Sequence, residues 1–196
     1  MKSLLPADPV KRGRVRLLLL AAFFASPMVA AWLAYEFEWA PGDAANYGEL
    51  VVPHAVPDVT LARDNERPLK ISSLRGKWIL LQFDAPACDA YCEKKLYSMR
   101  QIRRALGRDM ERVERLWILT GKGAPKAGLL AAFDGTMVAR STNGVFETAF
   151  SAAGTPVDHI YLVDPLGNVM MRFPRDPDAS RMLKDLKHLL KYSRIG

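Results

Sequence analysis

Cysteine and histidine are scarce in this chain of 196 residues, which has two cysteines and three histidines. Two cysteines are too few for a disulfide-rich scaffold or a four-cysteine zinc site. The 13 glycines and 13 prolines follow no collagen-like period. The sequence also lacks internal repeats, a glycine-rich phosphate loop and an HExxH motif. The two cysteines can therefore form one disulfide, one redox pair or part of one metal site.

The net charge of +7 is concentrated at the start of the chain. Residues 1–16 contain five Lys or Arg and one Asp, so more than half of the positive excess precedes the first long apolar run. No zinc finger, RNA-binding sheet motif or basic zipper accompanies the remaining charge. We therefore interpret the excess as a membrane-topology signal and expect no nucleic acid partner.

Residues 17–35 form an uncharged apolar run of 19 residues, close to the ~20 that cross a bilayer as a helix. The basic segment precedes this run and acidic residues follow it, which places residues 1–16 in the cytoplasm by the positive-inside rule. The apolar core of a cleaved signal peptide is shorter, about 7–15 residues, so we predict an uncleaved anchor. We therefore expect a single-pass protein of the bacterial inner membrane whose C-terminal domain is periplasmic.

The exported part begins with residues 36–56, whose prolines and glycines without sustained periodicity predict an extended tether. Residues 57–196 carry the pattern of an α/β domain with a βαβ unit and a later β-hairpin. This layout is that of a thioredoxin-like domain. The expected elements are a strand at 78–83, a helix at 96–106, a strand at 116–119, a short helix at 126–133, strands at 159–164 and 169–174, and a helix capped by Asp176.

Cys88 and Cys92 follow the first buried strand in the sequence Cys-Asp-Ala-Tyr-Cys. Four residues make about one helical turn, so the two sulfurs can bind one metal ion or close a disulfide. A cysteine near a helix N-terminus also has a lowered thiol pKa, because the helix dipole stabilises the thiolate. The position between a strand and a helix therefore favours a reactive pair over an inert one.

The C-x3-C motif in a membrane-anchored thioredoxin-like domain resembles the Sco/SenC family of copper chaperones for cytochrome c oxidase assembly. The resemblance covers about residues 57–192 and rests on LQFDAPACDAYC, LWILT and DHIYLVDPLGNV. It implies a copper ion bound by Cys88, Cys92 and His159. It also implies that the partner is the copper-site subunit of a respiratory oxidase.

Three features depart from the family pattern. Family members usually have proline after each cysteine, whereas this chain has Asp89 and Glu93. Residues 121–125 replace the family's Asp-Pro-x-x-Asp segment, and His159 is about three residues nearer to the next Tyr-Leu pair than usual. The chain therefore resembles a shortened and divergent relative.

Two other functions remain open from the residues alone. In a thiol-disulfide oxidoreductase, Cys88 is the attacking thiolate and Cys92 resolves the mixed disulfide. In a non-catalytic assembly protein, the same pair is a structural disulfide. Metal binding requires His159, whereas thiol exchange does not.

A basic run covers residues 94–115. We interpret it as the solvated face of a helix, the usual role of such a run. The alternative is electrostatic attraction to an acidic partner or to anionic lipid. Its members are Lys94, Lys95, Arg100, Arg103, Arg104, Arg108, Arg112 and Arg115.

Overall fold

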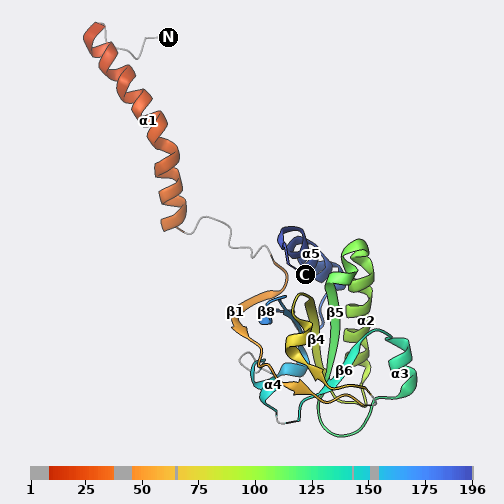
Figure 1. Cartoon of the computed structure of the whole chain (residues 1–196). Helices are drawn as coiled ribbons and strands as arrows, with labels where there is room; N and C mark the ends of the chain where they lie inside the picture. Colours follow the sequence, from red (N-terminus) through yellow and green to blue (C-terminus); the bar gives the residue numbers. More distant parts are fainter. Residues whose placement is uncertain (1–8, 38–45, 65, 143, 151–154, 196) are drawn as a thin grey trace. The chain divides into compact units, whose positions relative to one another are not determined.

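The structure is a computed structural model that divides into two compact units, Met1–Ala45 and Asn46–Gly196 (Figure 1). The residues that it describes are 9–37, 46–64, 66–142, 144–150 and 155–195.

The first unit contains one long helix, α1 (Pro9–Glu36). Residues Val10–Glu36 have a mean hydropathy of 2.1 in their most apolar window, and no side chain of that window is buried. Pro27 lies inside the helix, as transmembrane helices tolerate. The helix begins before the uncharged run, so it includes basic residues of the N-terminal segment. The predicted N-terminal apolar helix is confirmed, and it is long and apolar enough to cross a membrane.

The second unit is built on a six-stranded mixed sheet with the order β1-β8-β7-β4-β5-β6. Strands β4, β5 and β6, which form one side of the sheet, are parallel, while β7, β8 and β1 continue the sheet antiparallel. Two short strands, β2 (Thr60–Leu61) and β3 (Leu69–Lys70), form a separate pair. The strands of the large sheet are β1 (Glu49–Ala55), β4 (Trp78–Asp84), β5 (Val113–Leu119), β6 (Met137–Arg140), β7 (Ile160–Val163) and β8 (Asn168–Arg172).

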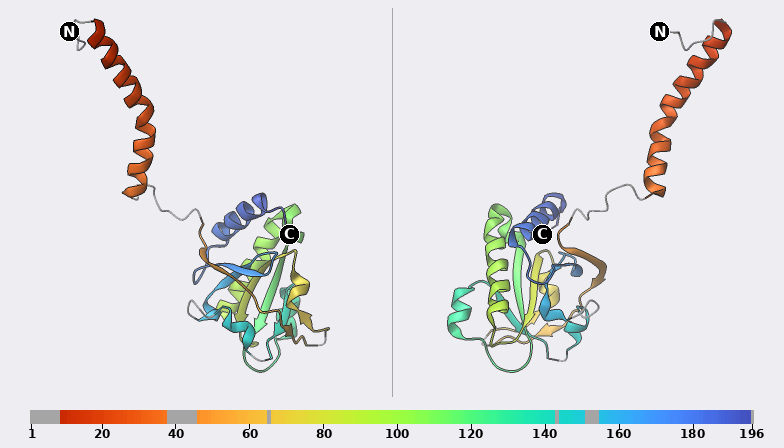
Figure 2. Two further views of the ribbon diagram at one scale, coloured as in Figure 1. Left: turned by 60° about the vertical axis from the view of Figure 1, so that its left-hand side comes forward. Right: turned by 180° about the vertical axis from the view of Figure 1, so that it is seen from behind.

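Helices α2 (Ala90–Ala105) and α5 (Ala179–Tyr192) contact each other and pack on one face of the sheet (Figure 2). The opposite face carries a second core cluster, to which α4 (Val145–Thr148) contributes. The alternation of buried residues along β4 and β5 divides their side chains between these two clusters. The other helical segments are α3 (Ala127–Ala132), η1 (Ile71–Leu74), η2 (Gly107–Arg112) and η4 (Pro156–Asp158).

The predicted fold class, an α/β thioredoxin-like domain with an N-terminal apolar helix, is confirmed. The structure differs from the predicted tether at residues 49–55, which form β1 and pair with β8. This edge strand has mostly exposed side chains, so its sequence shows no buried-face alternation. Residues 38–45 of the predicted tether lie outside the described residues.

The sequence predicted Asp176 as the cap of the last helix, and this prediction is wrong. The cap is Asp178. The Asp178 carboxylate accepts hydrogen bonds from the backbone N–H groups of Ser180 and Arg181. Asp176 instead adopts a left-handed backbone conformation with φ +57°. Two aspartates two residues apart offer equivalent cap signals, and the tertiary structure selects the second one.

Candidate functional site

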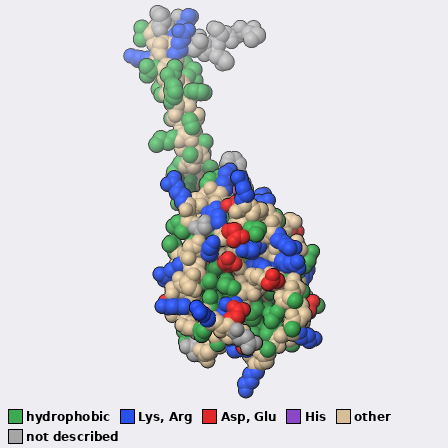
Figure 3. Space-filling model, turned by 45° about the vertical axis from the view of Figure 1, so that its right-hand side comes forward, with side chains coloured by type: hydrophobic (Ala, Val, Ile, Leu, Met, Phe, Trp, Pro, Cys, Tyr) green, Lys and Arg blue, Asp and Glu red, His purple; other side chains and the backbone are tan. Residues whose placement is uncertain are grey.

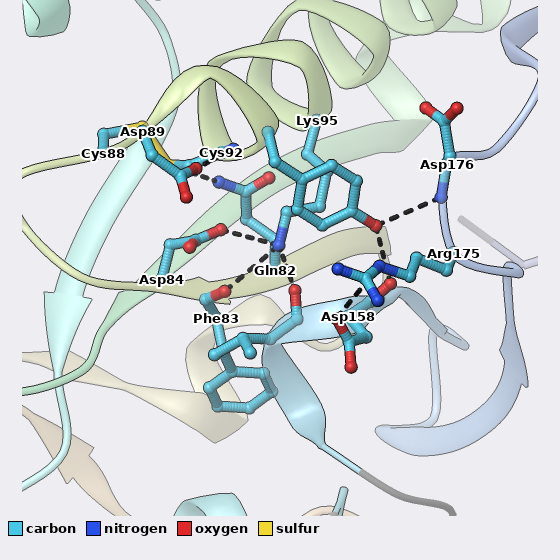
Figure 4. Close-up of polar contacts among 12 residues, drawn as sticks. Gln82, Phe83, Asp84, Cys88, Asp89, Cys92, Lys95, Asp158, Arg175 and Asp176 are labelled. Atoms are coloured by element: carbon cyan, nitrogen blue, oxygen red, sulfur yellow. Dashed lines mark hydrogen bonds and ion pairs between the residues drawn. A yellow bond between two sulfur atoms is a disulfide. The ribbon is translucent and has the colours of Figure 1, made fainter.

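The cysteine pair lies between the C-terminal end of β4 and the first turn of α2 (Figure 4). Cys88 and Cys92 form a disulfide with their Cα atoms 5.2 Å apart. Asp89 caps α2, and its carboxylate accepts a hydrogen bond from the Cys92 N–H at 2.9 Å. Cys88 therefore precedes the helix and adopts a left-handed conformation with φ +43°. The spacing predicted that both cysteines lie on one face of the helix, and this prediction is wrong.

The two sulfur-bearing residues differ in access to solvent. Cys88 is 7% exposed, whereas Cys92 is fully buried at 0%. A thiolate arriving from solvent can therefore reach Cys88 more readily than Cys92. For an exchange reaction, this difference in burial favours attack at Cys88 over attack at Cys92.

Two polar side chains of β4 point toward α2 beneath the disulfide. Because side chains alternate along a strand, Gln82 and Asp84 share the face that carries Trp78 and Leu80 in the α2-side core. The buried Gln82 side chain donates from Nε2 to the Cys92 Sγ at 3.7 Å. Gln82 thus supplies a hydrogen-bond donor to the sulfur that would become a thiolate on reduction.

Lys95 completes this polar group from α2. Its side chain is 1% exposed, and its Nζ lies 2.6 Å from Asp84 Oδ2. Nζ also donates to the backbone carbonyls of Phe83 and Val157. Burial raises the pKa of the Asp84 carboxyl, and the hydrogen bond and charge of Lys95 oppose that shift. A buried ion pair therefore joins β4, α2 and the segment before β7 (Figure 4).

Tyr91 lies beside this polar group, with its ring centroid 4.9 Å from Lys95 Nζ. Its hydroxyl donates to the Asp158 carbonyl at 2.8 Å and accepts from the Asp176 N–H at 3.2 Å. Arg175 lies near the Tyr91 ring and 3.5 Å from the Asp158 carboxylate. The first turns of α2 are thereby fixed to η4 and to the loop after β8.

The structure does not bring His159 and the cysteine pair together. His159 Nδ1 lies 2.7 Å from the Phe173 carbonyl oxygen, and its ring packs edge-on against Tyr161 with centroids 6.0 Å apart. Tyr161 belongs to the core cluster opposite α2, whereas both cysteines belong to the α2-side cluster. Within the described part of the chain, no group of three His, Cys, Asp or Glu side chains could hold a metal ion. The hydrogen bond between His159 Nδ1 and the Phe173 carbonyl would have to open before Nδ1 could bind a metal ion.

Sequence reasoning missed three residues of this site: Gln82, Asp84 and Lys95. The available signal was the placement of two polar residues at alternate positions of an otherwise apolar strand. Lys95 was predicted to lie on a solvated helix face, and that prediction is wrong because its ammonium group is buried against Asp84. Arg115 of the same basic run is also buried, since it lies on β5 and not on a helix.

The Gln82 contact predicts a measurable shift of redox potential. Replacing Gln82 by methionine removes the donor to Cys92 and makes the reduced, thiolate form less stable. One hydrogen bond contributes about 1 kcal/mol, so we expect the potential to become about 20 mV more negative. Equilibration of the chain with glutathione buffers at neutral pH measures the potential. The control is Gln101→Met, at a half-buried position nearer the C-terminal end of α2. An unchanged or less negative potential would contradict a role for Gln82.

Several solved structures have a fold similar to that of this chain. Yeast Sco1 with copper bound is 16% identical, with a TM-score of 0.61 over 73% of this chain and 96% of that one. BsSco, described as a member of the Sco family of cytochrome c oxidase assembly proteins with a disulfide switch, is 17% identical, with a TM-score of 0.54 over 72% and 96%. The thioredoxin domain of a thiol-disulfide oxidoreductase from Bacteroides vulgatus is 16% identical, with a TM-score of 0.53 over 72% and 99%. At these identities the likeness establishes the fold.

No curated protein sequence matches the chain. One family does match: its description is transmembrane-like, thioredoxin-like, C-terminal domain, and it covers residues 78–193. That segment contains both cysteines, the polar group beneath them and more than half of the chain. Together with the apolar helix α1, the match indicates a single-pass membrane protein. The chain therefore belongs to the family of transmembrane-like, thioredoxin-like C-terminal domains.

Proposed function

We propose that this chain is a membrane-anchored thiol-disulfide exchange protein whose Cys88–Cys92 pair cycles between the disulfide and the dithiol. The observation that carries the proposal is the Cys88–Cys92 disulfide at the start of α2, with the Gln82 amide donating to the buried sulfur. A helix N-terminus and a hydrogen-bond donor both stabilise a thiolate, which makes a disulfide easier to reduce. The Bacteroides vulgatus oxidoreductase and the disulfide switch of BsSco show that the same fold occurs in proteins with this chemistry.

The reaction proceeds through one mixed disulfide. A client thiolate attacks the Cys88 sulfur, the Cys88–Cys92 bond breaks, and Cys92 leaves as a thiolate that takes up a proton. A second client thiol loses its proton and attacks the mixed disulfide, so that a client disulfide forms and the Cys88 thiol is released. Two electrons and two protons thereby pass from the client to the pair, and the reverse sequence reduces a client disulfide.

We further propose that α1 anchors the chain in the bacterial inner membrane, with the basic N-terminal segment in the cytoplasm and the second unit in the periplasm. The distribution of charge around the apolar run supports this orientation. The periplasm is an oxidising compartment, in which a disulfide persists unless a reductant opens it.

The redox potential of the pair tests the proposal. The full chain in neutral detergent is equilibrated with glutathione buffers, and the fraction of free thiol is measured by alkylation. We expect a potential above about −300 mV, because structural disulfides of secreted proteins lie below that value. The double variant Cys88→Ser/Cys92→Ser is the blank. A potential below about −300 mV would assign the pair to a structural staple and overturn the proposal.

Copper handling is a second candidate function, favoured by the fold shared with yeast Sco1 with copper bound. Two thiolates are soft ligands that suit Cu(I), so the reduced pair has suitable donors for copper as a cargo ion. His159 would be the third ligand if its hydrogen bond to the Phe173 carbonyl opened. The partner in this case is the copper-site subunit of a respiratory oxidase, by analogy with the oxidase assembly family of BsSco.

Anaerobic titration of the reduced full chain with Cu(I) tests the second candidate. Copper handling predicts one tightly bound Cu(I) per chain and at least about tenfold weaker binding in Cys92→Ser, since one thiolate ligand is lost. Weaker binding in His159→Ala would identify the third ligand. Absence of stoichiometric binding, or binding unchanged in Cys92→Ser, would overturn copper handling and leave thiol exchange untouched.

A further inference from the structure

A cavity of about 370 Å³ lies between the C-terminal half of α2, the start of β5 and the turn after α3, away from the cysteine pair. Four of the residues that line it are arginines. Arg100, Arg103 and Arg104 come from α2 and Arg115 from β5, while Asp134 contributes a carboxylate. Four cations and one anion therefore surround the same small volume.

Arg115 is the unusual member of this set because its side chain is buried. The residue is 3% exposed, and its Nη2 donates to the Asp134 carbonyl at 2.6 Å. Among the residues that the structure describes, its Nε and Nη1 have no hydrogen-bond partner. Gly135 approaches so closely that an added Cβ would lie 3.1 Å from Nη2. A buried guanidinium with two unsatisfied donor nitrogens is costly unless an anion pairs with it.

The neighbouring arginines add to the positive field and do not neutralise it. Arg100 donates to the Ala132 carbonyl at 2.8 Å and Arg103 to the Val113 carbonyl at 2.6 Å, both neutral acceptors. Burial lowers the pKa of Arg115, and the charges of Arg103 and Arg100 lower it further. The acidic side chains around Arg103 reach it only at 3.9 Å and come from Glu111 and Glu114.

We propose that this cavity is a binding site for a small anion that carries a phosphate group. A guanidinium presents parallel N–H donors that match two phosphate oxygens, and several arginines around one volume can contact different oxygens of the same group. The cavity also has room for a small substituent attached to the phosphate. Figure 3 shows Lys and Arg side chains spread over this side of the second unit, with Asp and Glu side chains between them.

The site is tested by calorimetric titration of the full chain in neutral detergent and phosphate-free buffer of low ionic strength. Inorganic phosphate is the first probe, and we expect saturable binding of one anion per chain. Arg115→Met removes the buried donors and Arg104→Met removes an exposed one. Each should weaken binding about tenfold, because a charge-assisted hydrogen bond to phosphate contributes at least this factor.

Arg108→Met is the matched control, since Arg108 is exposed on the neighbouring η2 segment and does not line the cavity. Binding should change less than about twofold in this control. Arg104 lies on the surface, so its variant keeps the test valid even if Arg115→Met does not fold. Absence of saturable binding, or an equal loss in Arg108→Met and Arg104→Met, would overturn the proposal.

A second probe separates the two sources of a phosphate group. Glycerophosphoglycerol is the water-soluble headgroup of phosphatidylglycerol and carries a phosphodiester. Tighter binding of this headgroup than of inorganic phosphate would assign the site to anionic lipid, and the reverse order would assign it to free phosphate. Either order supports the site, whereas failure of both probes to bind rejects it.

Discussion

Replacing Lys95 by methionine is expected to destabilise the second unit by about 3–5 kcal/mol at neutral pH. The substitution keeps most of the apolar stem and removes the charge that pairs with Asp84 Oδ2 at 2.6 Å. It leaves the Asp84 carboxylate, whose side chain is 14% exposed, without its cation. It also removes the donor to the Phe83 and Val157 carbonyls, so these two hydrogen bonds from α2 to β4 and to η4 are lost.

Urea unfolding of the full, oxidised chain in neutral detergent measures this effect through the fluorescence of the buried Trp78 and Trp117. The matched control is Lys94→Met, because Lys94 pairs with Asp176 on the surface with both side chains more than half exposed. An exposed pair contributes at most about 1 kcal/mol. Equal losses in the two variants would show that the Lys95–Asp84 pair has no special role in stability.

The cost of Lys95→Met should depend on pH. Burial raises the pKa of Asp84 above its ordinary value of 3.8, so the folded state holds this proton more tightly than the unfolded state. The stability contribution of such a group is fully present below its unfolded pKa and is lost as the pH rises through its folded pKa. Lys95 lowers the pKa of Asp84 in the folded state. In Lys95→Met this pKa should therefore be higher, and stability should be lost over a wider pH range. The difference from the native chain should therefore be smallest in acid.

Adding Asp84→Asn to Lys95→Met should recover part of the lost stability. An asparagine in place of Asp84 removes the carboxylate that Lys95→Met leaves uncompensated, and the double variant has neither buried charge. Asp84→Asn alone leaves the more deeply buried Lys95 ammonium without its anion. A double-mutant cycle in urea thus measures the coupling between the two groups.

Local patterns in the sequence were sufficient to predict the fold class. The apolar run at 78–83 and the βαβ spacing correspond to β4, α2 and β5, because strands buried on both faces read as continuous apolar runs. Strand β1 was missed because an exposed edge strand lacks a buried-face pattern. The short elements β6 and α4 lie in a stretch whose mixed composition gave no periodic signal.

The candidate site could be predicted only in part. The strand-to-helix junction placed the cysteine pair correctly at the N-terminal end of a helix, although only Cys92 belongs to the helix and Cys88 precedes it. The burial of Lys95 depends on Asp84, which approaches from another element, and a basic run in the sequence does not reveal such a contact. His159 lies between η4 and β7, and its side chain is placed by contacts with the Phe173 carbonyl and the Tyr161 ring. A residue count from the cysteines does not reveal such contacts.

The two cysteines should respond differently to substitution if the pair exchanges with client thiols. In Cys92→Ser the remaining Cys88 can form a mixed disulfide, but no second sulfur is available to resolve it. We expect this variant to accumulate a long-lived adduct with glutathione and to lose catalysed exchange down to the background rate. In Cys88→Ser the remaining sulfur is fully buried, so little adduct should form.

Alkylation rates of the single-cysteine variants measure this asymmetry directly. We expect iodoacetamide to modify Cys88 in Cys92→Ser at least about tenfold faster than Cys92 in Cys88→Ser, because access and thiolate character govern the rate. Denatured chains, in which both cysteines are exposed, provide the reference for intrinsic reactivity. Equal rates in the folded variants would contradict Cys88 as the attacked sulfur. A faster reaction at Cys92 would reverse the two roles, because the leaving sulfur in this mechanism must be the one that clients do not reach.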